Sequence, residues 1–210
     1  MSGFIRKNSL LRTKILSAGY FWQSFLFLDA ESSSCLLGWA TTFSLPSEHQ
    51  LKRSSLLTTL PTLNKEWKVS FEFKATSYKQ RAYAQILQLT IGSKSGSIGD
   101  RTPALWIHKS RGVYLVTTLN GKPNAGKYFR TSKPSISAWN TVEIAQVKTG
   151  SNYIFSLVIN NKTLWSVKNT DPREFSSVKV FASSPWYAAQ AGSIRGFRIE
   201  NMMPGGRYQF

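Results

Sequence analysis

Apolar and polar side chains alternate along most of the chain after residue 66, and this period of two predicts β-strands. The clearest case runs from Trp67 to Lys74, where every second residue is apolar and the residues between are polar. A strand with one face on a core and the other in water produces this pattern. Segments of the same kind lie at 85–91, 105–107, 113–115, 142–144, 153–159, 163–168, 178–182 and 195–199.

Residues that favour turns separate these segments. The Asn160-Asn161 pair predicts a tight hairpin because asparagine tolerates positive φ, and glycines and prolines fall between the other segments. No stretch of ten or more residues has a clear helical period. Many short strands without helices predict an all-β fold. We expect a two-sheet antiparallel β-sandwich, a jelly roll whose inner faces form the core.

The regular pattern begins near Asn64 and suggests three parts. Residues 1–63 form a basic and apolar extension, 64–203 the sandwich, and 204–210 a tail. The extension has the order of a secretory signal peptide followed by a linker: four basic residues up to Lys14, the apolar run 15–28, and small residues before Cys35. An amphipathic or poorly ordered segment is the alternative. The run is short for a membrane span, so we expect no transmembrane segment.

Composition narrows the function classes. Hydrophobic residues make up 41% and aromatic residues 13%, which excludes a disordered chain. A single cysteine and two histidines exclude an internal disulfide and a Cys/His zinc cluster. The net charge is +17, and 21 of the 27 Lys and Arg lie in residues 64–210. Such a surface attracts polyanions. Basic side chains gather in the middle of the chain at Lys79, Arg81, Lys94, Arg101, Lys109, Arg111, Lys122, Lys127, Arg130 and Lys133.

Several segments resemble a known fold family. The stretches 139–146 and 153–167 are similar to the late strands of concanavalin A-like and laminin-G-like jelly rolls, and 192–199 is similar to their last strand. Segments 99–106 and 172–187 resemble a narrower group, the poorly characterised secreted laminin-G-like modules of invertebrates. The resemblance covers about residues 64–200. It implies an extracellular module that binds carbohydrate or matrix glycans without catalysis.

The acidic residues bear on catalysis and on calcium. Glucanases with this fold use carboxylates on one strand, and no two acids of residues 64–210 stand two or four apart on a predicted strand. We therefore expect no enzyme. The resemblance also implies calcium at a loop rim, for which Asp100 and Asp171 are the available carboxylates. The alternative is that both aspartates only stabilise turns. We therefore expect no cofactor, apart from calcium as a hypothesis to be tested.

Two loops carry the residue types that a sugar requires. Asp100 and Arg101 lie in one, and Trp186 and Tyr187 in the other; together they offer hydroxyl partners and aromatic faces for stacking. Trp106 would join them if its strand face looks outward. The alternative is that Asp100 pairs with an arginine and Trp186 caps the core. We expect Trp67, Trp139 and Trp165 to pack in the core, and Asn161, in an Asn-Lys-Thr triplet at a hairpin tip, to accept an N-glycan.

The expected function is that of a secreted, lectin-like binding module. Its expected partners are a glycan or sulfated polysaccharide, with extracellular matrix proteins as further candidates and no specific nucleic acid. One alternative is a structural or adhesive module that contacts proteins and has no sugar pocket. The other is a polyanion binder that acts through its basic surface, with nucleic acid as its partner inside a cell.

Overall fold

The computed structural model describes residues 39–78, 82–92 and 94–202. The chain divides into two units, Met1–Ser34 and Cys35–Phe210, and all the described residues belong to the second. The expected signal peptide and the tail at 204–210 lie outside the described residues. In the part of the chain that is described, no helix has the length and apolar character needed to cross a membrane.

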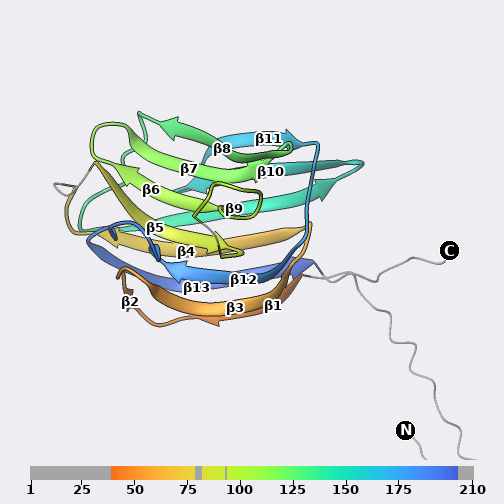
Figure 1. Ribbon diagram of the computed structural model, residues 1–210. Helices are drawn as coiled ribbons and strands as arrows, with labels where there is room; N and C mark the ends of the chain where they lie inside the picture. The colour runs from red at the N-terminus through yellow and green to blue at the C-terminus, as the bar shows by residue number, and fades with distance from the viewer. Residues whose placement is uncertain (1–38, 79–81, 93, 203–210) are drawn as a thin grey trace, which may run out of the picture. The chain divides into compact units, whose positions relative to one another are not determined.

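The prediction of an all-β, two-sheet antiparallel sandwich is confirmed (Figure 1). The seven-stranded sheet has the order β1 (Trp39–Leu45), β13 (Gly192–Met202), β4 (Trp67–Ala75), β9 (Trp139–Thr149), β10 (Asn152–Ile159) and β11 (Lys162–Asn169), and β2 (His49–Gln50) pairs with β13. The six-stranded sheet has the order β3 (Ser55–Leu63), β12 (Phe175–Ala182), β5 (Tyr83–Thr90), β6 (Ala104–His108), β7 (Gly112–Leu119) and β8 (Lys122–Phe129). Figure 1 looks onto the outer face of the six-stranded sheet.

The period of two places the core between the sheets. In β4 the apolar residues Trp67, Val69, Phe71 and Phe73 are buried, and the polar residues between them are partly exposed. Apolar side chains of the other strands meet them and form one cluster. Its fully enclosed members include Phe73, Phe155, Phe197, Leu105, Leu115 and Ile144. Burial of this apolar surface is the main force that holds the two sheets together.

The sandwich includes more of the chain than the boundary at residue 64 allowed. Strands β1, β2 and β3 fall within residues 39–63 and pair with β12 and β13. In β3, Leu60 and Leu63 are buried, whereas Leu56 is 50% exposed, so the strand lacks a strict alternation. β3 also contains Pro61, which is tolerated because β3 is an edge strand. The first part of the described chain therefore supplies edge strands rather than a linker.

The predicted hairpin turn at Asn160-Asn161 is confirmed. It joins β10 to β11, and the two φ angles are +49° and +61°. Asn120 and Gly121 join β7 to β8 in the same way, with φ of +53° and +73°. Positive φ at both central residues matches the twist of the flanking strands. These two turns fix the registers of β7 with β8 and of β10 with β11.

Candidate functional site

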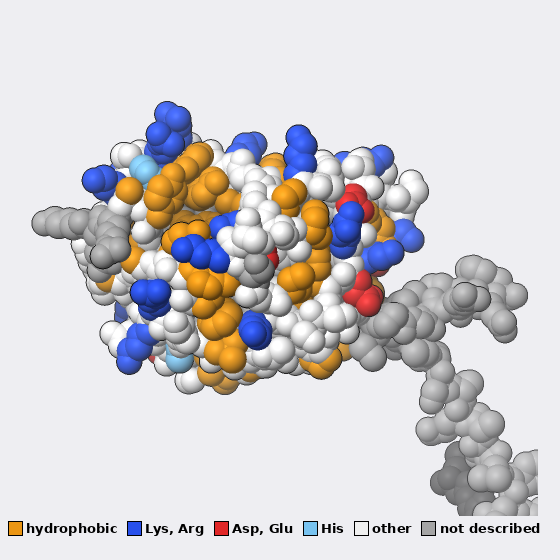
Figure 2. All heavy atoms as spheres, viewed as in Figure 1, with side chains coloured by type: hydrophobic (Ala, Val, Ile, Leu, Met, Phe, Trp, Pro, Cys, Tyr) orange, Lys and Arg blue, Asp and Glu red, His pale blue; other side chains and the backbone are white. Residues whose placement is uncertain are grey.

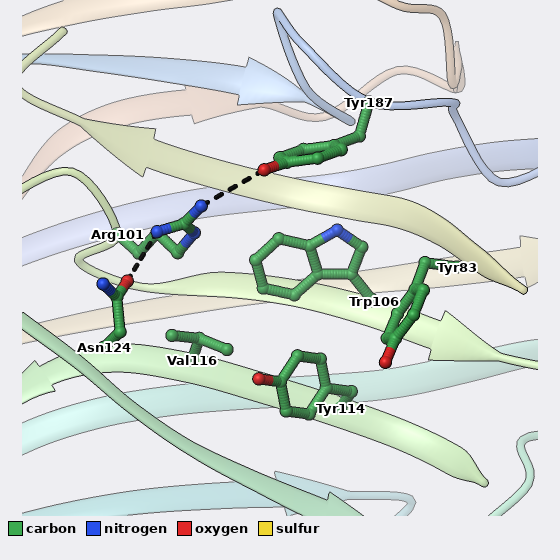
Figure 3. A pocket seen from close by; sticks show the side chains of 7 residues that line it. All are labelled: Tyr83, Arg101, Trp106, Tyr114, Val116, Asn124 and Tyr187. Atoms are coloured by element: carbon green, nitrogen blue, oxygen red, sulfur yellow. Dashed lines mark hydrogen bonds between the residues drawn. The ribbon is translucent and has the colours of Figure 1, made fainter. Parts of the chain in front are cut away.

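A hollow of about 330 Å³ lies on the outer face of the six-stranded sheet (Figure 3). Its position follows from the alternation in β6 and β7: Leu105 and Leu115 enter the core, so Trp106 and Tyr114 face outward. These two residues stand opposite each other in the strand register. The lining residues are Tyr83, Arg101, Trp106, Tyr114, Val116, Asn124 and Tyr187.

Aromatic rings form the walls of this hollow, which we call the aromatic hollow. The ring of Trp106 lies 5.6 Å from that of Tyr114 and 6.3 Å from that of Tyr187, measured between centroids. Tyr83 lies 5.9 Å from Tyr114. Because Trp106 is only 5% exposed, its indole acts as the floor rather than as a projecting platform. Neighbouring rings hold these side chains in fixed positions before any ligand arrives.

Two phenol groups of the hollow, those of Tyr83 and Tyr114, have raised pKa values. Burial, and then the neighbouring Tyr128 phenol, raises the pKa of Tyr114. A hydrogen bond between the Tyr83 and Tyr128 hydroxyls is the largest cause of the raised pKa of Tyr83. Neutral phenols both donate and accept hydrogen bonds. The hollow therefore combines apolar ring faces with hydroxyl groups.

Space for Tyr114 depends on a glycine in the neighbouring strand. Gly126 of β8 pairs with Val116 of β7, and a Cβ atom at position 126 would lie 2.8 Å from the Tyr114 hydroxyl oxygen. Tyr114 in turn stacks on Tyr128, with centroids 4.1 Å apart and ring planes 16° from parallel. The absent side chain at Gly126 thus lets Tyr114 lie over β8 and extend the wall.

Arg101 occupies one end of the aromatic hollow and is held by neutral groups. Its Nη1 donates to Asn124 Oδ1 at 2.5 Å, and its Nη2 donates to the Tyr187 hydroxyl at 3.3 Å (Figure 3). Asn124 is itself oriented, because its Nδ2 donates to the backbone oxygen of Gly96 at 2.8 Å. Among the described residues, no carboxylate forms an ion pair with Arg101. The hydrogen bond between Arg101 and Tyr187 joins the two loops that were predicted to bind a sugar.

Asp100 is not part of the hollow. It is 1% exposed, and its Oδ2 accepts hydrogen bonds from the backbone nitrogens of Gly96 and Ser97, both at 2.7 Å, and from Ser95 Oγ at 3.0 Å. Its Oδ1 is buried without a hydrogen-bond partner. The carboxylate therefore supports the loop before Arg101 and, among the described ion pairs, does not pair with that arginine.

The structure does not join Asp100 and Asp171 into a metal cluster. Within the described ranges, no group of three or more His, Cys, Asp or Glu side chains has the arrangement of a metal site. Asp171 Oδ2 instead lies 2.7 Å from Arg173 Nε. The calcium hypothesis stays a prediction that rests on single carboxylates.

Trp186 lies beside the aromatic hollow. It lines an adjoining hollow of about 470 Å³ together with Arg53, Ala82, Ala188 and the shared residues Tyr83 and Tyr187. Ser184 Oγ holds this loop by accepting hydrogen bonds from the backbone nitrogens of Trp186, at 3.0 Å, and Tyr187, at 3.1 Å. Trp186 is half-buried and is not among the side chains that pack against the core. It therefore forms a wall and does not cap the core.

The opposite outer face has a hollow of about 350 Å³ that contains two glutamates. Glu72 of β4 and Glu143 of β9 reach it because these strands are neighbours, which spacing along one strand could not reveal. Arg195 binds Glu72 through Nε at 2.7 Å and Nη2 at 3.3 Å, and Lys68 Nζ lies 3.9 Å from Glu143. Each of the two carboxylates therefore has a basic side chain within ion-pair distance.

Three of the five predicted ligand residues come together in the aromatic hollow: Arg101, Trp106 and Tyr187. Trp186 lines the adjoining hollow and Asp100 lines neither. Sequence reasoning missed Tyr83, Tyr114, Val116 and Asn124. The alternation around Leu115 could have found Tyr114 and Val116, because residues on either side of a core position face outward. Asn124 and Tyr83 carry no such signal.

The expected roles of the other tryptophans hold in two cases. Trp67 belongs to the core and is 3% exposed, and Trp165 packs against the core cluster. The prediction for Trp139 is wrong, because this residue lies on the outer face of the seven-stranded sheet. Lys74 Nζ lies 4.6 Å and the Arg195 guanidinium 4.2 Å from the centre of its ring.

Asn161 is exposed at the β10–β11 turn and lines the hollow with the two glutamates.

Charge is distributed unevenly around the aromatic hollow. Figure 2 shows hydrophobic side chains gathered on this face, with Lys and Arg around them and few Asp or Glu. None of the six strands of this sheet contains an Asp or Glu. Lys94 Nζ lies 5.3 Å from the Tyr187 ring centre, and the Arg111 guanidinium 5.2 Å from that of Tyr128. Of the predicted basic cluster, Lys79 and Arg81 lie outside the described residues.

No protein-family model matches the chain, and no curated protein matches it in sequence. Solved structures share part of its arrangement. The CBM40 module of the Ruminococcus gnavus IT-sialidase, bound to α2,3-sialyllactose, is 18% identical with a TM-score of 0.49; the match covers 73% of this chain and 90% of that one. The receptor-binding domain of botulinum neurotoxin D is 18% identical with a TM-score of 0.49, over 78% of this chain and 41% of that one.

Domain 4 of AbnA, an extracellular arabinanase of Geobacillus stearothermophilus in complex with arabinotriose, is 16% identical with a TM-score of 0.43. That match covers 69% of this chain and 66% of the other. At these identities and scores, the likenesses give no information about the ligand of this chain.

Proposed function

We propose that the chain is a non-catalytic carbohydrate-binding module and that the aromatic hollow is its binding site. The observation that carries this proposal is the arrangement of Trp106, Tyr114 and Tyr187 around one hollow that also presents Arg101 and Asn124. Sugar rings have C–H groups on their faces, which pack on aromatic rings, and hydroxyl groups at their edges, which require hydrogen-bond partners. The hollow supplies both kinds of surface within one site.

The size of the site limits the ligand. A volume of about 330 Å³ is at the lower end of the range for small-molecule pockets, so the hollow accommodates a short segment of a glycan. The adjoining hollow at Trp186 offers room for the next sugar unit. Both hollows are formed by side chains that neighbouring rings or hydrogen bonds already hold, which lowers the entropic cost of binding.

A glycan array probed with the full chain tests this proposal. We expect binding to a subset of glycans, and we expect Tyr187→Ala to weaken it while thermal unfolding stays close to that of the wild type. Lys168→Ala, on β11 of the other sheet, serves as the matched surface control. Binding to no glycan, or equal binding by all three proteins, would contradict the assignment of the site.

A polyanion binder is the second candidate function, and the charge distribution favours it. The side chains Lys109, Arg111, Lys122, Lys127, Arg130 and Lys133 belong to or adjoin β6, β7 and β8, in which no acidic residue occurs. A diffuse basic surface binds through counterion release and loses affinity steeply with salt. Binding that disappears between about 0.15 M and about 1 M salt would favour this candidate over a sugar pocket.

An extracellular location is part of the proposal, and Asn161 gives a way to test it. The Asn161 side chain is exposed at the β10–β11 turn, on the face opposite the aromatic hollow, so a glycan there would leave the proposed binding site open. Expression with the native N-terminus in a secreting eukaryotic cell should release a protein whose mass falls on deglycosylation. Asn161→Gln should abolish that change in mass. A protein retained in the cytosol would contradict the location.

A further inference from the structure

We infer that the sugar recognised in the aromatic hollow is acidic, with a carboxylate or sulfate group that binds Arg101. This inference rests on the proposed carbohydrate function and specifies its ligand. It follows from the partners of Arg101, from the absence of acids around the site, and from the position of the guanidinium relative to the rings.

The partners of Arg101 leave its charge uncompensated. Asn124 and Tyr187 accept one hydrogen bond each and both are neutral, because the two accepting atoms are an amide oxygen and a phenol oxygen. A guanidinium has five N–H donors, so three remain after these two contacts. Arg101 is also partly buried, and partly buried charges are usually paired.

Some other arginines of the chain differ from Arg101 because they pair with carboxylates. Arg173, Arg195 and Arg198 form ion pairs with Asp171, Glu72 and Glu200. Arg53, Arg101, Arg111 and Arg130 have no such partner among the described residues. Of these four, Arg53, Arg111 and Arg130 are exposed to water, whereas Arg101 is partly buried in the lining of the aromatic hollow.

An anionic ligand would meet no repulsion from the lining of either hollow. Neither lining includes Asp or Glu, and the only nearby carboxylate in sequence, Asp100, is turned into its own loop. Lys94 lies over Tyr187 and adds a second positive charge at the rim. The electrostatic field of the hollow therefore favours an oxyanion.

The geometry suits an acidic group on a sugar ring. Figure 3 shows Trp106 between the Arg101 guanidinium at one end of the hollow and Tyr83 at the other. A ring that packs on Trp106 would bring a substituent at its edge to the guanidinium. Because Asn124 and Tyr187 fix the orientation of the guanidinium fork, it can accept a carboxylate or sulfate with two hydrogen bonds and little loss of side-chain freedom.

Matched oligosaccharides test this inference on the full chain. Each set has the same linkages and differs in one sugar, which is neutral, carries a carboxylate or carries a sulfate. Affinities are measured by calorimetry for the wild type, Arg101→Gln, Arg101→Lys and Lys122→Gln. Lys122 is the matched control, because it is exposed on β8 of the same sheet, lines neither hollow and carries the same charge.

We expect the wild type and Lys122→Gln to bind an acidic member at least about tenfold more tightly than its neutral counterpart, the scale of one charge-assisted contact. Arg101→Gln should reduce that ratio to near one. Arg101→Lys should keep part of it, because the charge remains but the fork is lost. The ratio between ligands, rather than the affinity itself, separates charge recognition from any general disturbance of the site. Whichever acidic series gives the larger ratio identifies the anion.

The remaining outcomes overturn one claim or both. If the wild type binds neutral and acidic members equally, the acidic ligand is wrong and the carbohydrate function stands. If no member of any set binds, the carbohydrate function is wrong and this inference fails with it. If Lys122→Gln lowers the ratio as much as Arg101→Gln does, the preference arises from the general basic surface and not from Arg101.

Discussion

The two outer faces of the sandwich carry hollows of nearly equal size, about 350 Å³ and about 330 Å³, with opposite electrostatic character. On the seven-stranded sheet, the carboxylates of Glu72 and Glu143 each lie within ion-pair distance of a basic side chain. On the six-stranded sheet, Arg101 has only neutral partners. The glutamates of the first hollow are thus paired within the protein, whereas Arg101 of the second leaves a charge for a ligand to satisfy.

The tryptophans of the two faces differ in the side chains that surround their rings. Lys74 Nζ lies 4.6 Å and the Arg195 guanidinium 4.2 Å from the ring centre of Trp139. Trp106 packs with Ala104 and Val116 and with the rings of Tyr114 and Tyr187, and it borders the open hollow. Cations beside a ring compete with a sugar for its face, whereas Trp106 borders an open hollow. This comparison favours the six-stranded sheet as the binding face.

The largest expected effect comes from removing the indole of each face in turn. Trp106→Ala should lower the free energy of unfolding by about 3–5 kcal/mol, because this side chain is nearly buried, and should abolish glycan binding by the folded fraction. Trp139→Ala should cost about 1–2 kcal/mol, the scale of two lost cation–π contacts, and leave binding unchanged. Urea unfolding and calorimetry give both quantities. Loss of binding in Trp139→Ala alone would reverse the assignment of the faces.

Trp186→Ala tests whether the Trp186 side chain lines the binding site or packs in the core. Because Trp186 is half-buried and does not pack on the core, its removal should weaken binding by about 1–3 kcal/mol, the scale of one aromatic stack. The melting temperature should change little. Tyr153→Ala on β10 of the other sheet provides a control for loss of a partly exposed ring. A large drop in stability with unchanged affinity of the folded protein would show that Trp186 serves the core.

Breaking the ion pair of the seven-stranded face should have a smaller effect. Glu72→Gln removes the partner of Arg195 on a partly exposed surface, where such pairs contribute about 0.2–1 kcal/mol. We expect a loss of that size in chemical unfolding and no change in glycan affinity. The same variant tests catalysis: any glycosidase activity of the wild type that disappears in Glu72→Gln would contradict the non-catalytic proposal.

The smallest expected effect is a dependence of stability on pH through His108. Its Nδ1 accepts hydrogen bonds from the backbone nitrogens of Arg111, at 3.0 Å, and Ser110, at 3.2 Å, so the folded protein requires a neutral ring. Burial, with Arg111 and Lys109 nearby, lowers the pKa of His108 below its ordinary value of 6.5. The unfolded chain therefore binds the proton first as the pH falls, and stability decreases below about pH 6.5.

Unfolding measured between about pH 7.5 and about pH 5.5 checks this effect. His108→Gln should flatten the curve over that range. An equal slope in the wild type and in His108→Gln would contradict the role of this ring.

The strands that were not predicted from the sequence lie at the edges of the sheets. Segments such as Trp67–Lys74 were predictable because one face lies on the core and the other in solvent. Strands β1, β3 and β8 lie at sheet edges, where β8 contains Pro123 and Gly126 and β3 contains Pro61. These strands form because a neighbour supplies hydrogen bonds, and their own sequences lack a regular alternation.

The site was predictable to a similar degree. Arg101 and Tyr187 could be selected because a guanidinium and an aromatic ring stand in turn-rich loops. The burial of Asp100 was not predictable, because its partners are backbone nitrogens of a loop whose path the sequence does not specify. The placement of Glu72 beside Glu143 depends on strand order, which local spacing does not determine.

Residue-resolved NMR during titration with the best-binding glycan tests whether the six-stranded sheet is the binding face. We expect the Trp106 indole N–H, the Arg101 side chain and the backbone around Tyr187 to shift with one common dissociation constant, and the Trp139 indole N–H not to move. Both tryptophans lie on outer faces, so each reports on its own sheet. Shifts confined to Trp139 and to strands β4 and β9 would contradict the assignment of the six-stranded sheet as the binding face.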